Sequence, residues 1–243
     1  NREALDAVIK AYDVRGVVGQ DIDEAFVRDV GAAFADLLRG EGETTVAIGH
    51  DMRPSSPALA DAFAEGVTSQ GLDVVQLGLC ATDQLYFAAG TFNCAGAMFT
   101  ASHNPAQYNG IKLCRKGATP VGEATGLADI KDKMVEGIAP ADITPGTVSH
   151  RDLLGDYADF LNESVDLQSS RPLVVAVDAA NGMGGHTVPA VFEALPFDVR
   201  PLYFELDGTF PNHEANPLDP KNLVDLQKFV VEQGADIGLA FDG

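Results

Sequence analysis

A serine beside a histidine follows an apolar run in the segment FTASHNP, residues 99–105. In open α/β sheets, ligands bind outside the carboxyl ends of the strands, and Pro105 prevents a simple helical continuation after such an end. We therefore expect Ser102 to lie in an exposed loop, where it can act as a nucleophile or carry a phosphoryl group. The alternative for this stretch is a plain Ser/Asn/Pro turn.

A serine hydrolase is the weaker interpretation of this serine. His103 is its direct neighbour in the sequence, and adjacent side chains usually diverge, so His103 is poorly placed to act as the base of a catalytic triad. The chain also has no G-x-S-x-G motif, the sharp turn that presents the nucleophile in α/β-hydrolases.

Basic residues near this serine predict a site for an anion. Lys112, Arg115 and Lys116 follow within a few positions of His103, and Arg15 precedes the first helical pattern in YDVRG. Each of them alone is typical of a solvated surface charge. The chain has only 16 Lys and Arg against 36 Asp and Glu, so a local cluster of positive charge is notable.

The composition excludes several classes of protein. A formal net charge of −20 opposes binding to a nucleic acid backbone. Hydrophobic residues at 46% and charged residues at 21% are typical of a globular chain with a buried core. No apolar run approaches the roughly 20 residues of a membrane-spanning helix. Three cysteines without a CxxC pair indicate neither a disulfide framework nor a zinc site, so we expect a reduced, cytoplasmic protein.

Strand-like and helix-like segments alternate along the chain, which predicts an α/β fold with mixed or mostly parallel sheets and helices on their faces. The Pro- and Gly-rich stretch 137–148 predicts a boundary between two consecutive domains, residues 1–143 and 144–243. Expected strands are 45–49, 72–79, 95–101, 110–114, 173–177, 199–204 and 237–241, and expected helices are 23–38, 55–70, 83–89, 152–165, 188–195 and 222–231.

Two further segments lie at predicted strand ends. The run NGMGG, residues 181–185, resembles a dinucleotide-binding loop only in part, and a sharp strand-to-helix turn explains its glycines. Asp242 follows the last apolar strand. It becomes a candidate metal ligand only if further acidic residues follow it and a phosphate lies opposite, because Mg²⁺ prefers hard oxygen ligands.

Together these motifs resemble the N-terminal half of the α-D-phosphohexomutases, the phosphomannomutase/phosphoglucomutase family. The resemblance covers nearly the whole chain, and TASHNP with NGIK is its most specific part. The matching segments, in order, are YDVRG (12–16), TASHNP (100–105), NGIK (109–112), VDAANGMGG (177–185), FPNHEANP (210–217) and ADIGLAFDG (235–243).

The resemblance implies a four-domain enzyme of which this chain is the first two domains. It implies that hexose 1-phosphate and hexose 6-phosphate of mannose or glucose interconvert through a bisphosphorylated sugar, which also acts as activator. Ser102 would be the phosphoserine and would share a Mg²⁺ ion with Asp242. The other implied catalytic or substrate-binding residues are Tyr12, Arg15, His103, Asn104 and Lys112, with Lys112 as the proton-transfer group and Arg15 stabilising phosphoryl charge.

In the family, the metal-binding loop continues with further aspartates, and the sugar- and phosphate-binding loops lie in the third and fourth domains. The chain is therefore expected to be a fragment that is inactive alone and works with the remaining C-terminal domains. The alternatives are a non-catalytic anion-binding module of the same fold and a phosphoglucosamine mutase. The residues that distinguish mannose from glucose lie outside this segment. The overall character of the N-terminal segment favours phosphomannomutase.

Overall fold

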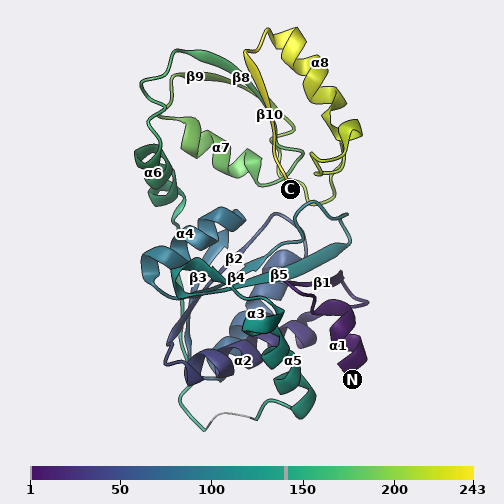
Figure 1. Ribbon diagram of the computed structural model, residues 1–243, viewed down its shortest axis with the longest axis vertical. Helices are drawn as coiled ribbons and strands as arrows, with labels where there is room; N and C mark the ends of the chain where they lie inside the picture. Colours follow the sequence, from purple (N-terminus) through teal and green to yellow (C-terminus); the bar gives the residue numbers. More distant parts are fainter. Residues whose placement is uncertain (1, 140–141) are drawn as a thin grey trace. The chain divides into compact units, whose positions relative to one another are not determined.

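The computed structural model of the chain describes residues 2–139 and 142–243. Contacts divide the chain into two units, both α/β as predicted (Figure 1). The first contains most of the chain up to Asp152, and the second contains Leu153–Gly243 together with the short segment Ser102–Ala106. Within the described residues, no helix is both long enough and apolar enough to cross a bilayer.

The first unit is built on one mixed sheet. Its strand order is β1-β5-β4-β2-β3-β7, with β6 paired to β5. Strands β4, β2, β3 and β7 run parallel, whereas β5 is antiparallel to β1, β4 and β6. The strands are β1 (Val14–Val17), β2 (Thr45–His50), β3 (Asp73–Leu79), β4 (Ala95–Phe99), β5 (Tyr108–Arg115), β6 (Thr119–Pro120) and β7 (Val148–His150).

Helices cover both faces of this sheet, with α2, α3 and α5 on one face and α4 on the other (Figure 1). Phe34, Phe63 and Phe99 are fully buried in the larger core, and their rings follow one another at 6.4 and 5.5 Å. The helices are α1 (Arg2–Val8), α2 (Glu24–Gly40), α3 (Ser56–Ser69), α4 (Thr82–Phe92) and α5 (Leu127–Glu136), with short 3₁₀ turns at Lys116–Ala118 and Glu123–Thr125.

Helix α3 begins next to Ser55, where the sequence predicts a helix start, but only α2 has a side-chain cap. The carboxylate of Asp23 accepts a hydrogen bond from the Phe26 amide at 2.8 Å and so caps α2. Ser55 occupies the corresponding position before α3, yet its side chain makes no capping bond. Its hydroxyl instead accepts a hydrogen bond from Asn109 on β5.

The second unit has a three-stranded, fully parallel sheet in the order β10-β8-β9. Val175 and Val177 of β8 and Val188 of α7 form its buried core. Its elements are α6 (Leu154–Ser164), β8 (Leu173–Asp178), α7 (Gly184–Phe192), β9 (Phe197–Leu202), a 3₁₀ turn (Pro220–Leu223), α8 (Val224–Gln233) and β10 (Ile237–Ala240).

The division between the units falls later than the boundary expected after residue 143. The short strand β7 comes after that point, yet it pairs in parallel with β3 in the first unit. The division therefore lies between Asp152 and Leu153. Strand β7 has three exposed residues, so no apolar alternation marks it in the sequence.

Candidate active site

Ser102 lies in the loop after β4, as predicted, and has an unusual backbone. Its φ is +53°, in the left-handed region that residues other than glycine rarely occupy. Such conformations cost about 1–3 kcal/mol and persist where surrounding contacts hold them, often at functional sites. The loop begins where the Thr100 amide donates to the Gly110 carbonyl at 3.1 Å. The segment is thus an ordered loop with a constrained serine.

Ser102, His103 and Asp242 lie together in the second unit. The Ser102 hydroxyl donates to Oδ1 of Asp242 at 2.8 Å. Nδ1 of His103 is 3.1 Å from Oδ2 of the same carboxylate and 3.4 Å from Oγ of Ser102. One carboxylate therefore holds both side chains that the sequence places side by side.

This arrangement differs from a hydrolase triad. In a triad, opposite nitrogens of the histidine contact the serine and the carboxylate, so that one nitrogen can accept the serine proton. Here the same nitrogen of His103, Nδ1, faces both Ser102 and Asp242, and the Ser102 hydroxyl donates a hydrogen bond to Asp242. Because an ionised carboxylate only accepts hydrogen bonds, Nδ1 must donate to it and cannot also take the serine proton.

Close backbone approaches bring Asp242 to this position. Asp242 follows β10, and the Phe241 amide donates to the Asp178 carbonyl at 3.0 Å. A Cβ on Gly243 would lie 2.9 Å from the Ser102 carbonyl oxygen, and a Cβ on Gly182 would lie 2.7 Å from Gly243 Cα. Glycine is therefore required at both positions, and at Gly182 the reason is this close approach and not a left-handed backbone.

In the first unit, Arg15 on β1 and Lys112 on β5 share one acidic partner. Nη2 of Arg15 is 2.5 Å and Nζ of Lys112 is 3.4 Å from Oδ2 of Asp13. The antiparallel pairing of β1 with β5 brings the two cations close together. Their side chains are about a quarter exposed, at 24% and 29%, so both charges remain accessible to an anion.

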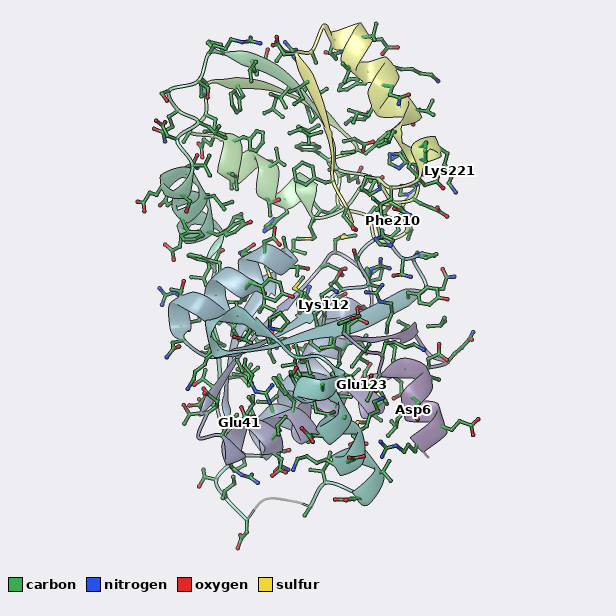
Figure 2. All side chains as sticks on the ribbon, in the orientation of Figure 1. Asp6, Glu41, Lys112, Glu123, Phe210 and Lys221 are labelled. Carbon is green, nitrogen blue, oxygen red and sulfur yellow. The ribbon has the colours of Figure 1, made fainter. Side chains whose placement is uncertain are left out.

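Arg115 and Lys116 do not join this pair, contrary to the expectation that they and Lys112 form one anion site. Arg115 forms an ion pair with Glu41 at 2.7 Å, and the pKa of Glu41 is held below its usual value, chiefly by this hydrogen bond. Lys116 pairs with Glu43 at 2.8 Å, which raises the lysine pKa. Figure 2 shows Glu41 well away from Lys112.

The two remaining predicted substrate-binding residues differ in exposure. The side chain of Tyr12 is 84% exposed, and Asn104 is half-buried in the serine loop.

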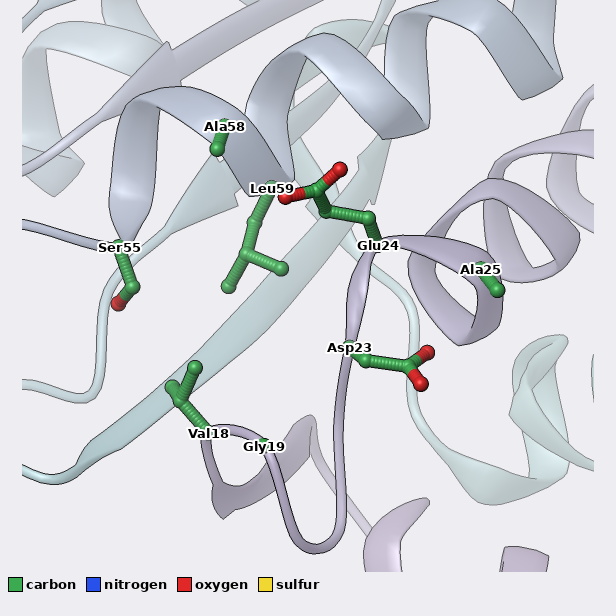
Figure 3. Close-up of a pocket in the computed structure, with 8 residues that line it drawn as sticks. All are labelled: Val18, Gly19, Asp23, Glu24, Ala25, Ser55, Ala58 and Leu59. Carbon is green, nitrogen blue, oxygen red and sulfur yellow. The ribbon is translucent and has the colours of Figure 1, made fainter.

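A separate pocket of about 400 Å³ lies between the starts of α2 and α3 (Figure 3). Among the described residues, those that line it include the acidic Asp23 and Glu24 and no basic side chain, so its charge disfavours a phosphorylated ligand.

Comparison with known proteins identifies the fold family. The family description "Phosphoglucomutase/phosphomannomutase, alpha/beta/alpha domain I" matches residues 6–138, and the corresponding description of domain II matches residues 155–243. The chain belongs to the phosphoglucomutase/phosphomannomutase family. This confirms the resemblance read from the motifs in the sequence.

Individual relatives agree with this family. A protein named "Phosphohexose mutases" from Xanthomonas campestris is 40% identical over 96% of this chain and 52% of its own length. A phosphoglucomutase from Neisseria meningitidis is 40% identical over 97% of this chain and 51% of its own length. A crystal structure of a phosphoglucomutase/phosphomannomutase family protein from Burkholderia thailandensis superposes with a TM-score of 0.91, at 33% identity, over 98% of this chain and 52% of that one.

The chain spans about half the length of the curated relatives it matches. Within the residues that the structure describes, no group of three or more His, Cys, Asp or Glu side chains could hold a metal ion. Ser102 Oγ and the Asp242 carboxylate nevertheless supply two hard oxygen donors at 2.8 Å from each other. These two donors fit part of a Mg²⁺ coordination shell, which takes a few protein oxygens together with water and phosphate.

Sequence reasoning missed two buried polar networks in this member of the phosphoglucomutase/phosphomannomutase family. In the second unit, Nε2 of His213 lies 2.8 Å from Oδ2 of Asp178, and its Nδ1 lies 2.8 Å from the Glu214 carbonyl. In the first unit, Asp51 and Arg53 form an ion pair. Asp178 is the last residue of β8 and Asp51 directly follows β2. A carboxylate at the end of an apolar strand is the sequence signal that could have indicated these networks.

Proposed function

We propose that the full-length protein containing this chain interconverts hexose 1-phosphate and hexose 6-phosphate, with mannose, glucose or both as the sugar. The observation that carries this proposal is the contact of Ser102 with Asp242 at 2.8 Å, formed by a serine held in a left-handed conformation after a strand. The names of the relatives support the same reaction class.

In this reaction, Ser102 carries the phosphoryl group. A bond forms between phosphorus and a free hydroxyl oxygen of the sugar phosphate, while the bond to Ser102 Oγ breaks and a hexose bisphosphate results. Lys112 is the proton-transfer group at the sugar hydroxyl and His103 assists at Oγ, so that the net step moves one proton from the sugar hydroxyl to Ser102 Oγ. The bisphosphate turns over and returns its other phosphoryl group to Ser102, releasing the isomeric monophosphate.

The remaining residues bind and stabilise. Arg15, which with Lys112 contacts Asp13, stabilises the charge of the transferred phosphoryl group, because phosphoryl transfer depends mainly on positioning and electrostatics. Tyr12 and Asn104 bind the substrate. Ser102 and Asp242 hold Mg²⁺ with ligands from the rest of the protein, and the bound ion would neutralise phosphoryl charge.

The partners of this chain are the hexose phosphate, the hexose bisphosphate activator and the C-terminal domains of the same enzyme. We place the enzyme in the cytoplasm. The support for this location is that Cys80, Cys94 and Cys114 are all free thiols, as is usual in a reducing compartment.

The test uses the full-length protein and its Ser102→Ala variant. Phosphopeptide mapping should find phosphate on Ser102, and turnover of mannose 1-phosphate or glucose 1-phosphate should fall at least about 10³-fold in the variant, since no other group can carry the phosphoryl in its place. Ser164→Ala, at the exposed end of α6, is the matched control and should retain full activity.

Two results would contradict the proposal. Equal turnover in Ser102→Ala and Ser164→Ala would show that Ser102 does not carry the phosphoryl group. Binding of hexose phosphates without turnover in the wild-type protein would favour a non-catalytic anion-binding module of the same fold.

A further inference from the structure

Asp51 and Arg53 form a fully buried ion pair in the first unit, outside the residues placed in the reaction above. Nε of Arg53 lies 3.2 Å from Oδ2 of Asp51, and their side chains are 0% and 1% exposed. Oδ1 of Asp51 also accepts hydrogen bonds from the Arg53 amide at 3.0 Å and from the Ser56 hydroxyl at 2.6 Å. Because burying charges is costly, such a pair is poorly explained by stability alone.

The pair reaches the two chain segments that flank the serine loop. The Asp51 amide donates to the carbonyl of Phe99, the last residue of β4, at 2.9 Å. Nη1 of Arg53 donates to the carbonyl of Tyr108, the first residue of β5, at 2.9 Å. Residues 100–107 connect Phe99 to Tyr108 and include Ser102. Asp51 thus binds one end of the loop, Arg53 binds the other, and their ion pair links the two.

A second set of bonds strengthens the attachment at Tyr108. The next residue, Asn109, is fully buried, and its side-chain amide donates to Ser55 at 2.8 Å and to Ser56 at 2.9 Å. Because Ser56 in turn donates to Asp51, a continuous chain of hydrogen bonds runs from Asn109 to the ion pair. Bonds in such chains polarise and strengthen one another.

We propose that Asp51 and Arg53 are positioning residues for the phosphoryl-carrying serine. They hold the two ends of the 100–107 loop at a fixed separation, which limits the conformations open to Ser102. They touch neither substrate nor phosphoryl group. This inference rests on the proposed mutase function. A displacement of about 1 Å at a reacting group can cost about 100-fold in rate, so a small loosening of the loop should be measurable.

The test compares Arg53→Lys with Arg28→Lys in the full-length enzyme. Lysine keeps the charge, but it lacks the planar fork that reaches two acceptors with separate nitrogens. Arg28 is a matched control because it forms an exposed ion pair with Glu65 on the helices of the same unit. We expect Arg53→Lys to lower kcat about 10- to 100-fold, with KM for the hexose phosphate changed less than about twofold. Arg28→Lys should leave both unchanged.

A second readout follows the loop itself. Amide hydrogen exchange of the peptide that covers residues 100–109 should be faster in Arg53→Lys than in the wild type and unchanged in Arg28→Lys. If Arg53→Lys does not fold, Ser56→Ala replaces it with the same readouts. That variant removes one acceptor of Asn109 and one donor to Asp51.

The outcomes separate this inference from the proposed function. A wild-type enzyme without mutase activity contradicts the proposed function. An active wild type in which the folded variant keeps kcat within twofold, loses only substrate affinity, or shows unchanged exchange in the loop overturns the positioning role. Loss of kcat together with faster exchange confined to the loop supports it.

Discussion

At the residue scale, the site depends on which atoms share a partner. A single carboxylate, Asp242, accepts from Ser102 and faces His103, and a single carboxylate, Asp13, faces Arg15 and Lys112. Their adjacency in the sequence predicts that the side chains of Ser102 and His103 diverge, whereas both face Asp242. Only the family resemblance places Ser102 near Asp242, through a shared metal ion. Such contacts depend on how distant segments pack, and Asp242 lies 140 positions from Ser102.

Also at the residue scale, the ion pair of Glu41 with Arg115 predicts a pH-dependent contribution to stability. The hydrogen bond from Arg115 lowers the pKa of Glu41 in the folded state. A lowered pKa stabilises the fold above the unfolded pKa of about 4.5, and this stabilisation is lost as the pH falls through the folded pKa. Glu41→Gln should therefore reduce the free energy of unfolding at pH 7 by about 0.2–1 kcal/mol, the range for exposed pairs.

Denaturant unfolding at several pH values measures this effect. The difference between the wild type and Glu41→Gln should shrink as the pH falls from 7 through the lowered pKa of Glu41. Glu136→Gln, at an exposed position near the end of α5, serves as control. A difference that stays constant between pH 7 and pH 3 would show that the carboxylate charge of Glu41 is not its source.

At the element scale, close helix packing explains two glycines inside helices. A Cβ on Gly66 of α3 would lie 2.1 Å from the Arg28 carbonyl oxygen, and a Cβ on Gly31 of α2 would lie 2.4 Å from the Phe63 carbonyl oxygen. The two helices therefore approach backbone to backbone. In the sequence, these glycines only weaken the helix signal, although here they mark the contact between α2 and α3.

This packing predicts opposite effects of the same substitution in two helices. A Cβ on Gly90 of α4 would meet no atom of another element within 4 Å, so Gly90→Ala should stabilise the protein by up to about 1 kcal/mol through helix propensity. Gly66→Ala should instead destabilise it by about 1–3 kcal/mol, because α2 and α3 must separate. Thermal or denaturant unfolding of both variants measures the signs, and a stabilising Gly66→Ala would contradict the packing.

The helices and strands also show which parts of the fold could be predicted from the sequence. Long segments with clear periodicity, such as α2 and β8, were predicted within a few residues of their observed bounds. The helices α1 and α5 and the short strands β1, β6 and β7 were not predicted. Strands as short as β1 and β7 have too few residues for an alternating pattern, and their partners, β5 and β3, hold them in place.

At the scale of the whole chain, the family and the two α/β units followed from the motifs, whereas the point of division did not. The position of the division depends on the pairing of β7 with β3, which lie far apart in the sequence. No local sequence pattern indicates this pairing. The serine loop is another example. Its residues Ser102–Ala106 group with the second unit, although the strands on either side of it belong to the first.

The three thiols provide a reporter of the global unfolding of the first unit. Burial raises the pKa of Cys80 and Cys114 to about 12 and that of Cys94 to about 11. A raised pKa keeps each thiol protonated at pH 8, and the thiolate is the reactive form. All three should therefore resist iodoacetamide in the native protein and react together as denaturant unfolds it. Mass spectrometry after timed labelling measures this, and rapid native labelling of one cysteine would contradict its burial.

The backbone conformation of Ser102 also determines whether threonine could replace serine at this position. Its positive φ is tolerable for an unbranched side chain, but it is a severe outlier for a β-branched one. Threonine offers the same hydroxyl chemistry, yet it would crowd its own main chain at this position. Natural variation here should therefore exclude threonine on conformational grounds, even where the chemistry of the oxygen would be retained.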